Sequence, residues 1–337
     1  MKAVYVSKEG RELQDRPIPS PDQHEVLIRN VAVSSNPKDW KIPFYMAPYA
    51  AVEGNDVAGY VEKVGEGVPK FKVGDKVAAF TKMRTDDKYG AYAEYSVSPS
   101  NTAFHLGPNT SFEDAAALPL AYSTAAIGLF KRLGLSEPDQ PGQRDGALLV
   151  WGGATTVGVY AIQLAKKAGY HVVAIAGSSQ DVPKSYGADE VLDYRNKSTS
   201  SLAFEIRQSY GGKGVKYIYD AVSEGTLEVV AEALKDVEGA KYTYVLTYTE
   251  EQLKTLPSNV HPERTLCATA YGEDSDFAEK WFDWVGKAIE AGGFRAQKVT
   301  VVPGGLEGVK EGLRRLQQGE VRGEKLVYRI KETPRLA

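Results

Sequence analysis

The chain has 337 residues, of which 42% are hydrophobic and 25% are charged, and its formal net charge is −3. This near-neutral balance gives no electrostatic basis for binding nucleic acid or a membrane surface, and no stretch approaches the roughly 18 to 20 consecutive apolar residues of a membrane span. The single cysteine, Cys267, excludes an internal disulfide and a cysteine-based structural zinc site. We therefore expect a cytoplasmic protein, and its length favours two domains.

The N-terminal third of the chain is predicted to be mostly β-structure. Its short segments mix β-branched and aromatic residues and are separated by Gly, Pro or Asp, at 25–34, 57–65, 75–80 and 91–98. This pattern indicates a small barrel-like domain. A helical stretch follows at 111–135, where apolar residues recur at three- and four-residue spacing.

From residue 146 onward, predicted strands alternate with helices. The strand candidates lie at 146–152, 171–177, 190–194, 216–222, 241–248 and 264–271. Such an alternation is typical of a parallel doubly wound sheet. The remaining chain has the pattern helix, strand, helix, strand, and we expect it to return to the first domain. The predicted domains are therefore 1–116 with 274–337, and 117–273.

The glycine-rich segment VWGGATTVG, residues 150–158, connects the first of these strands to a helix. A dinucleotide pyrophosphate binds backbone N–H groups at such a helix N-terminus. The glycines at 152–153 suit the tight exit from the strand, and Gly158 allows close packing of the helix. Thr155 and Thr156 offer hydroxyls where the usual fingerprint has its middle glycine. Alone, the motif is equally compatible with an empty turn, but its place at the start of the alternating series favours a dinucleotide.

The end of the second strand indicates which dinucleotide is bound. An NAD site usually has an acidic residue there, which binds the ribose 2′-hydroxyl. Here Ser178 and Ser179 follow the strand, and Lys184 comes five residues later. Hydroxyls and an ammonium suit a 2′-phosphate, so we predict NADPH. Asp181 favours the opposite choice, since its carboxylate is able to face a ribose.

Over nearly its whole length the chain resembles the medium-chain dehydrogenase/reductase superfamily. The matching stretches include VAVSSNPKDWK, EGNDVAGYVEKVGEGVPKFKVGDKVAAF, AAALPLAYSTA, GGATTVG, KSYGADEVLDY and GEKLVYRI. It is similar in detail to the zinc-independent fungal branch, which includes yeast proteins labelled zinc-type alcohol dehydrogenase-like and trans-acting enoyl reductases, and which is related to quinone oxidoreductases. The resemblance implies an α/β protein with a GroES-like β-barrel domain, a Rossmann domain and a cofactor cleft between them.

The same resemblance implies that no zinc is bound. Zinc-dependent members have Cys where this chain has Asn36, and Gly-His-Glu where it has Gly54, Asn55 and Asp56. A catalytic zinc needs three converging thiolate, imidazole or carboxylate ligands. The two amides are poor ligands and one carboxylate is insufficient, so we expect no metal site.

Without a metal to polarise a carbonyl, the hydride acceptor has to be electrophilic already. An enolate formed by hydride addition then needs a proton. The candidate donors are Lys41, Tyr45, Tyr49 and Tyr122, with Lys41 and Tyr45 favoured as catalytic residues. Each is also explained by packing or surface pairing, and water is an alternative proton source.

The residues expected to contact the cofactor come from the motifs above and from the resemblance. Asn36 is assigned to the nicotinamide end and Thr124 to the carboxamide, both by the resemblance. The complete predicted set is Asn36, Thr124, Gly153, Thr155, Thr156, Val157, Ser178, Ser179, Lys184, Tyr194, Leu246, Thr247 and Lys325.

The sequence thus predicts an NADPH-dependent oxidoreductase that reduces an activated double bond or carbonyl of a small molecule. An aldehyde or quinone reductase is the alternative within the superfamily, and a non-catalytic NADPH-binding protein is the alternative from another class. By analogy with the superfamily we expect a monomer or a homodimer.

Overall fold

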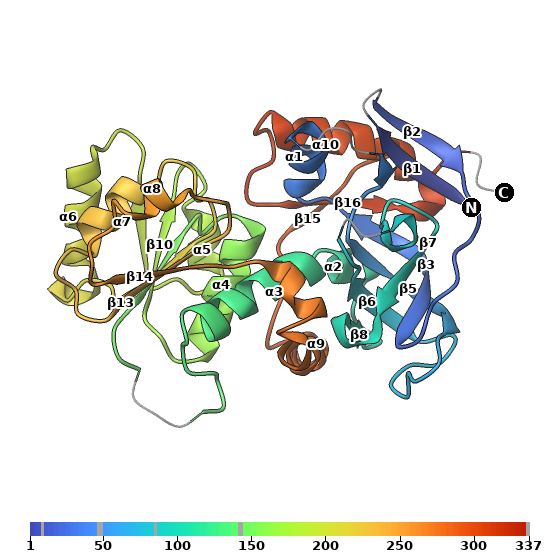
Figure 1. The fold of residues 1–337 in the computed structure, drawn as a ribbon, viewed down its shortest axis with the longest axis horizontal. Coiled ribbons are helices and arrows are strands. Elements are labelled where there is room, and N and C mark those ends of the chain that lie inside the picture. Colours follow the sequence, from blue (N-terminus) through green and yellow to red (C-terminus); the bar gives the residue numbers. More distant parts are fainter. Residues whose placement is uncertain (8–9, 46–49, 84–85, 141–143, 335–337) are drawn as a thin grey trace. The chain divides into compact units, whose positions relative to one another are not determined.

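The computed structural model describes residues 1–7, 10–45, 50–83, 86–140 and 144–334 (Figure 1). Its contacts divide the chain into two compact units. Unit 1 is Met1–Ser123 with Ala268–Ala337, and unit 2 is Thr124–Cys267. The predicted assignment of a catalytic role to 1–116 with 274–337, and of a cofactor-binding role to 117–273, stays a prediction.

Unit 1 is built around a seven-stranded sheet. Its order is β15-β16-β3-β5-β6-β8, and β7 also pairs with β3. The strands are β3 (Glu25–Ser34), β5 (Asp56–Val64), β6 (Lys76–Phe80), β7 (Tyr95–Pro99), β8 (Ala103–His105), β15 (Val299–Val301) and β16 (Lys325–Arg329). A smaller sheet has the order β2-β1-β4, with β1 (Lys2–Ser7), β2 (Gly10–Asp15) and β4 (Ala51–Val52).

The helices of unit 1 come from both ends of the chain. They are α1 (Lys38–Tyr45), α2 (Phe112–Ala116), α3 (Pro119–Ala126), which crosses into unit 2, α9 (Ser275–Glu290) and α10 (Val309–Gln317). Short 3-10 turns lie at η1 (Asp87–Tyr89), η2 (Ser100–Thr102), η4 (Cys267–Tyr271), η5 (Gly305–Gly308) and η6 (Ile330–Glu332). The C-terminal segment joins this unit because β16 pairs antiparallel with β3, with Val327 opposite Ser34.

Unit 2 is a parallel sheet of six strands in the order β11-β10-β9-β12-β13-β14, as the alternation predicted. Its strands are β9 (Leu148–Trp151), β10 (Val172–Ala176), β11 (Glu190–Asp193), β12 (Tyr217–Asp220), β13 (Ala240–Tyr244) and β14 (Val260–Arg264). Its helices are α4 (Thr156–Lys167), α5 (Asp181–Ser185), α6 (Thr199–Gly212), α7 (Leu227–Ala233) and α8 (Glu250–Leu253), and a π-helical turn, η3 (Ile127–Arg132), continues α3. All residues of β9 and β10 are buried, which is typical of central strands covered on both faces.

The sixth strand was placed wrongly by the sequence pattern. We expected it at 264–271, but β14 is Val260–Arg264, and Cys267–Tyr271 forms a 3-10 turn instead. The segment VHPER is largely exposed and contains Pro262, so it shows no apolar alternation. Proline is tolerated here because β14 is an edge strand, where one row of N–H groups needs no partner.

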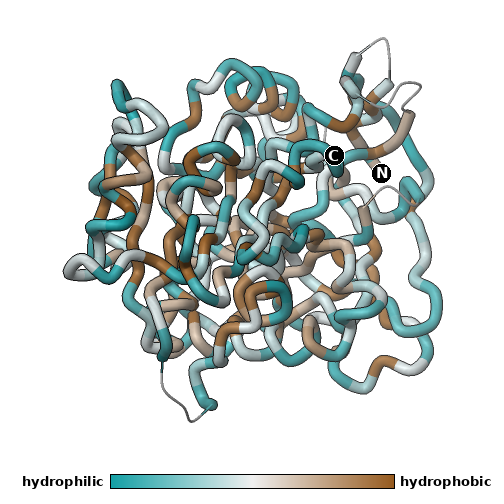
Figure 2. The backbone as a smooth tube through the Cα atoms, turned by 60° about the vertical axis from the view of Figure 1, so that its left-hand side comes forward, coloured by the Kyte–Doolittle hydropathy of each residue, from teal (hydrophilic) through white to brown (hydrophobic). Residues whose placement is uncertain are grey.

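Apolar residues occur in short runs along the coloured part of the trace (Figure 2). Within the ranges that the structure describes, no helix combines the length and the apolar character needed to cross a lipid bilayer.

Glu25, at the start of β3, has a buried carboxylate that accepts hydrogen bonds from several segments of unit 1 in its ionised form. Its buried carboxylate accepts hydrogen bonds from Tyr89 Oη (2.6 Å), Lys88 Nζ (3.0 Å), the Asp22 N–H (3.0 Å) and Lys82 Nζ (3.1 Å). Burial alone raises the pKa of Glu25, but these donors outweigh it and lower the pKa to about 2 from its ordinary value of 4.5.

We predict that this carboxylate makes the protein less stable in acid. A lowered pKa stabilises the fold above about pH 4.5, and the contribution is lost as the pH falls towards 2, by about 1–3 kcal/mol. The free energy of unfolding should be measured for wild type and for Glu25→Gln between pH 6 and pH 3. We expect the difference in favour of wild type to shrink as the pH falls. A constant difference between the two proteins across that range would contradict the prediction.

Candidate functional site

The strand order of unit 2 identifies where a ligand is expected to bind. The order reverses between β9 and β12, which lie side by side with Trp151 opposite Asp220. In open parallel sheets, ligands bind in the crevice beyond the carboxyl ends of the strands at such a switch point. In this chain the Gly152 turn follows β9 and the Val222 loop follows β12 at that point.

The turn after β9 has space for glycine alone. Gly152 has a positive φ of 76°, which other residues rarely adopt. A β-carbon at Gly158 would lie 2.2 Å from the carbonyl oxygen of Gly152, and one at Gly153 would lie 2.8 Å from Cβ of Ala174. The N-terminus of the helix therefore packs directly against the turn. Without side chains at these positions, a pyrophosphate is able to come close to the backbone, as binding at a helix N-terminus requires.

Thr155 is the N-cap of α4. Its hydroxyl oxygen accepts from the Gly158 N–H (3.1 Å), and the hydroxyl donates to the Gly152 carbonyl (2.8 Å). Thr156 and Val157 are the first two helical residues and are half-buried. The hydroxyl of Thr155 thus closes the turn, and its predicted contact with a phosphate, like those of Gly153, Thr156 and Val157, stays a prediction.

The residues predicted to bind the 2′-phosphate follow two neighbouring strands, β10 and β11. Ser178 is exposed, Ser179 is half-buried, and Lys184 is exposed on the short helix α5. No described residue pairs with the Lys184 ammonium. Tyr194 is 49% exposed, and a β-carbon at Gly177 would lie 3.1 Å from its ring, so the tyrosine lies against the backbone that precedes the two serines.

A buried hydrogen-bond network orders the loop after β12. The fully buried carboxylate of Asp220 accepts from Ser223 N–H (2.8 Å), Val222 N–H (3.0 Å), Tyr242 Oη (3.0 Å) and Thr226 Oγ1. Burial raises the pKa of Asp220, and these donors act in the opposite direction. The sequence pattern did not indicate this network, because its donors lie on two separate segments.

The same network reaches the end of β13. Ser223 has a positive φ of 64°, and its hydroxyl oxygen accepts from the N–H groups of Val245 (3.1 Å) and Leu246 (3.3 Å). Tyr248 donates its hydroxyl to the Ser223 carbonyl. The predicted contacts Leu246 and Thr247 therefore lie on a segment that is attached to the switch-point loop.

A second polar cluster lies inside unit 1 and contains two predicted cofactor residues. Asn36 and Lys325 are 4% and 3% exposed. The Lys325 ammonium donates to Asn36 Oδ1 (2.6 Å) and to Asp56 Oδ2 (3.1 Å), and Asn36 Nδ2 donates to Asp56 Oδ2 (2.7 Å). Ser34 also donates to Asp56 Oδ2 (3.1 Å). The side chains of Asn36 and Lys325 bind each other and Asp56, and direct contact of either with a cofactor stays a prediction.

The first turn of α1 is held by buried charges. Lys38 pairs with Asp39 (2.6 Å) and Glu53, and Asp39 Oδ2 accepts from the Asn36 N–H (2.8 Å) and Tyr92 Oη (2.6 Å). Burial raises the pKa of Glu53 while the Lys38 ammonium counteracts it. These contacts fix the helix that carries Lys41.

The proposed proton donors differ in their surroundings. Lys41 is half-buried, with Nζ 5.6 Å from the Trp40 ring centroid, and Tyr45 is 70% exposed at the end of α1. Tyr122 is fully buried, donates its hydroxyl to the Trp281 carbonyl (2.9 Å), and has its pKa raised well above the usual range by burial. Its hydroxyl therefore serves packing between α3 and α9. Tyr49 lies outside the described residues.

Thr124, the other residue assigned to the nicotinamide end, is buried in α3. Its carbonyl accepts from Tyr219 Oη of β12 (2.8 Å), so the helix is attached to the central sheet of unit 2.

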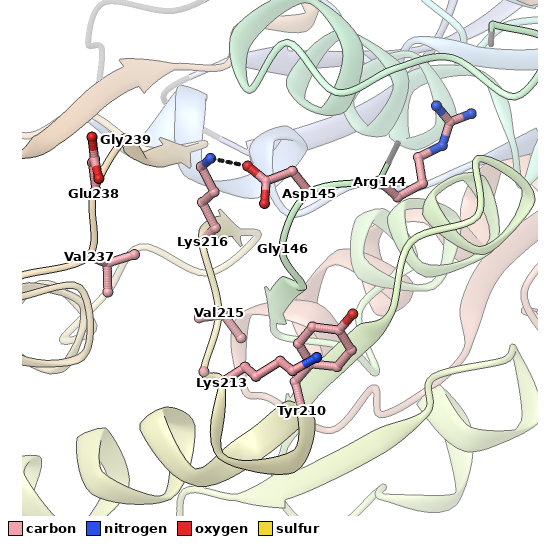
Figure 3. A pocket seen from close by; sticks show the side chains of 11 residues that line it. Arg144, Asp145, Gly146, Tyr210, Lys213, Val215, Lys216, Val237, Glu238 and Gly239 are labelled. Carbon is pink, nitrogen blue, oxygen red and sulfur yellow. Dashed lines mark hydrogen bonds and ion pairs between the residues drawn. The ribbon is translucent and has the colours of Figure 1, made fainter. Parts of the chain in front are cut away.

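A polar cavity of about 660 Å³ lies at the opposite, amino-terminal end of the unit 2 strands (Figure 3). Lys216 pairs with Asp145 across it, and Lys213 lies over the Tyr210 ring, 5.2 Å from its centroid. Arg144 lines it as well, donating to the carbonyls of Glu137 and Gln140. Because this cavity lies away from the carboxyl ends of the strands, it is separate from the expected ligand crevice.

Two family models match the chain. Residues 22–108 match the alcohol dehydrogenase GroES-like domain, and residues 156–287 match the zinc-binding dehydrogenase domain. A trans-enoyl reductase, fsr4, from Gibberella fujikuroi is 36% identical over 91% of this chain and 92% of its own. Another, ACTTS2, from Alternaria alternata is 31% identical over 98% of both chains. A solved structure of mycobacterial Rv1454c complexed with NADPH has a TM-score of 0.77 at 24% identity, covering 97% of this chain and 99% of that one.

The matched zinc-binding description raises the question of a metal site. The described ranges contain no group of three or more His, Cys, Asp or Glu side chains that could hold an ion. Where Asn36 and Asp56 meet, an ammonium already lies within hydrogen-bond distance of both oxygens. An amide, one carboxylate and a lysine do not match the ligands that zinc requires, so these residues do not fit a zinc ion.

Proposed function

Since this chain belongs to the medium-chain dehydrogenase/reductase superfamily, we propose that it is a zinc-independent, NADPH-dependent reductase of carbon–carbon double bonds conjugated to a carbonyl. The observation that carries the proposal is the glycine-only turn at the switch point of the unit 2 sheet. Relatives that are named trans-enoyl reductases and match nearly the full length support the enoyl class of acceptor.

The glycine turn after β9 fits the pyrophosphate of a dinucleotide. A β-carbon at Gly158 would lie 2.2 Å from the Gly152 carbonyl oxygen, so the N-terminus of α4 lies directly against the turn, where we propose that backbone N–H groups bind a pyrophosphate. When bound, a reduced nicotinamide supplies the hydride. Ser178, Ser179, Lys184 and Tyr194 are the residues that we propose to hold a 2′-phosphate.

The chain's own chemical task is then to deliver a proton to the α-carbon of the reduced acceptor. We propose Lys41 as the donor, with Tyr45 as the next candidate. The buried pairs Lys38–Asp39 and Lys38–Glu53 support this role, because they fix the helix that carries Lys41. A general acid of this kind contributes typically 10²- to 10⁴-fold to the rate.

The decisive experiment measures NADPH consumption with enals, enones, enoyl thioesters, quinones and aldehydes. We expect the conjugated alkenes to react fastest, and Lys41→Ala to lower kcat by roughly 10²- to 10⁴-fold. Lys63→Ala, on an exposed part of β5, is the matched control. Turnover of aldehydes or quinones alone would favour the alternative reductase class. Cofactor binding without turnover of any acceptor would favour a non-catalytic NADPH-binding protein.

Removing the Lys184 ammonium should weaken the preference for NADPH. A charge-assisted bond to the 2′-phosphate is worth about 1.5–3 kcal/mol, so Lys184→Ala is expected to raise KM for NADPH roughly tenfold or more. KM for NADH should change little, because NADH lacks that phosphate. Steady-state kinetics with both cofactors check this, with Lys254→Ala at the exposed end of α8 as the control. Equal changes in the two KM values, or a wild type that prefers NADH, would contradict the assignment.

We further propose that the protein acts on a small-molecule substrate as a monomer or a homodimer. Size-exclusion chromatography with light scattering distinguishes the two states.

A further inference from the structure

The buried cluster of Asn36, Asp56 and Lys325 brings together segments that are far apart in the chain. Asn36 follows β3, Asp56 begins β5, and Lys325 begins β16, almost 290 residues after Asn36. Asp56 is fully buried and the other two are nearly so. A lone carboxylate in such surroundings would be costly, and the ammonium of Lys325 at 3.1 Å neutralises it.

The two charges also determine how the Asn36 amide is oriented. Its oxygen accepts from the ammonium at 2.6 Å, and its nitrogen donates to the carboxylate at 2.7 Å. The reversed amide would place an NH₂ group against an ammonium and an oxygen against a carboxylate. Since an ammonium only donates and a carboxylate only accepts, the observed orientation is the one that both neighbours permit.

The Asp56 carboxylate also binds the N-terminus of α3. The Leu120 N–H at the start of that helix donates to Asp56 Oδ1 at 2.6 Å. An ionised carboxylate at a helix N-terminus is favourable both as an acceptor and through the helix dipole. Thr124 lies four residues farther along the same helix.

We propose that Lys325 is a positioning residue whose ammonium is the built-in cation of this cluster, in the place of a metal ion. It holds the Asn36 amide in one orientation and, through Asp56, sets the first turn of α3. The proposal rests on the proposed function in one respect, because it takes Asn36 and Thr124 as the residues that contact the nicotinamide end of the cofactor, as the superfamily resemblance implies.

The test compares Lys325→Met with the charge-neutral double variant Lys325→Met/Asp56→Asn. The single variant leaves a buried carboxylate unpaired, so we expect its melting temperature to fall by roughly 5–10 °C. The double variant should recover much of that loss. KM for NADPH should rise roughly tenfold in both, because neither retains the two charges that orient the amide. Leu326→Ala, the buried neighbour in β16, is the control for general destabilisation of the sheet.

The melting temperatures do not depend on catalysis, so they test the cluster even if the proposed function fails. A double variant no more stable than Lys325→Met would overturn the charge-pairing argument. A double variant with the KM of wild type, or a Leu326→Ala protein with the same rise in KM, would reduce Lys325 to a structural role. Stoichiometric zinc in the purified protein, with a melting temperature that falls on chelation, would overturn the assignment of the ammonium as the cation.

Discussion

Gly158→Ala is expected to lower the affinity for NADPH by roughly 100-fold, because it displaces the backbone that we propose to bind the pyrophosphate. The added β-carbon would lie 2.2 Å from the Gly152 carbonyl oxygen and 3.0 Å from Gly153 Cα. These are backbone atoms and cannot rotate away, so the helix and the turn have to separate. Titration of cofactor fluorescence with the purified variant measures the loss directly.

The control for Gly158→Ala makes the same chemical change in open space. A β-carbon at Gly272 has no neighbour within 4 Å, and the residue does not have a positive φ. Gly272→Ala should therefore keep the affinity of wild type. If Gly158→Ala also kept it, the turn after β9 would not be the pyrophosphate site, and the glycine would serve helix packing only.

Asp220→Ala is expected to lower the free energy of unfolding by about 2–4 kcal/mol, because it leaves several buried donors without an acceptor. The carboxylate accepts from two backbone N–H groups, Val222 and Ser223, and from the hydroxyls of Thr226 and Tyr242. Asp220→Asn keeps one oxygen acceptor and should lose less. Urea denaturation of both variants gives the comparison.

The matched control for Asp220 is another carboxylate at the end of a strand in the same sheet. Asp193 ends β11 and forms an exposed ion pair with Arg195. Exposed pairs contribute little, so Asp193→Ala should cost less than about 1 kcal/mol. A loss at Asp193 equal to that at Asp220 would argue against the buried network as the source of the effect.

The affinity for NADPH should also fall in Asp220→Ala, because the network holds the switch-point loop beside Gly152.

The fold of unit 2 was predicted from sequence patterns that span only a few residues. Strand and helix periodicity around Gly152 and Gly158 gave the parallel sheet and the position of the turn, because both signals lie within a few residues of one another. The edge strand β14 was missed since an exposed, proline-containing strand lacks the apolar alternation that sequence reasoning relies on. The network of Asp220 was missed for a different reason, because its donors from Thr226 and Tyr242 become neighbours only when two parallel strands align.

Unit 1 also combines features that residue types predict with features that only the tertiary structure shows. The residue types at Asn36 and Asp56 were enough to argue against zinc, since an amide and a single carboxylate are chemically unsuited to it. That Lys325 supplies the positive charge beside them was not contained in any local pattern. Nearly 290 residues separate Lys325 from Asn36, and only the pairing of β16 with β3 brings them together.

By itself, the sequence determined the fold class, the glycine turn and the poor zinc-ligand chemistry of Asn36 and Asn55, because these depend on residue type and short spacing. The tertiary structure decided how the polar side chains are used. It committed the hydroxyl of Tyr122 to a buried carbonyl, and it turned Lys325 towards Asn36 and Asp56. The physical reason is that burial requires every polar group to find a partner, and long-range packing alone decides which partners are within reach.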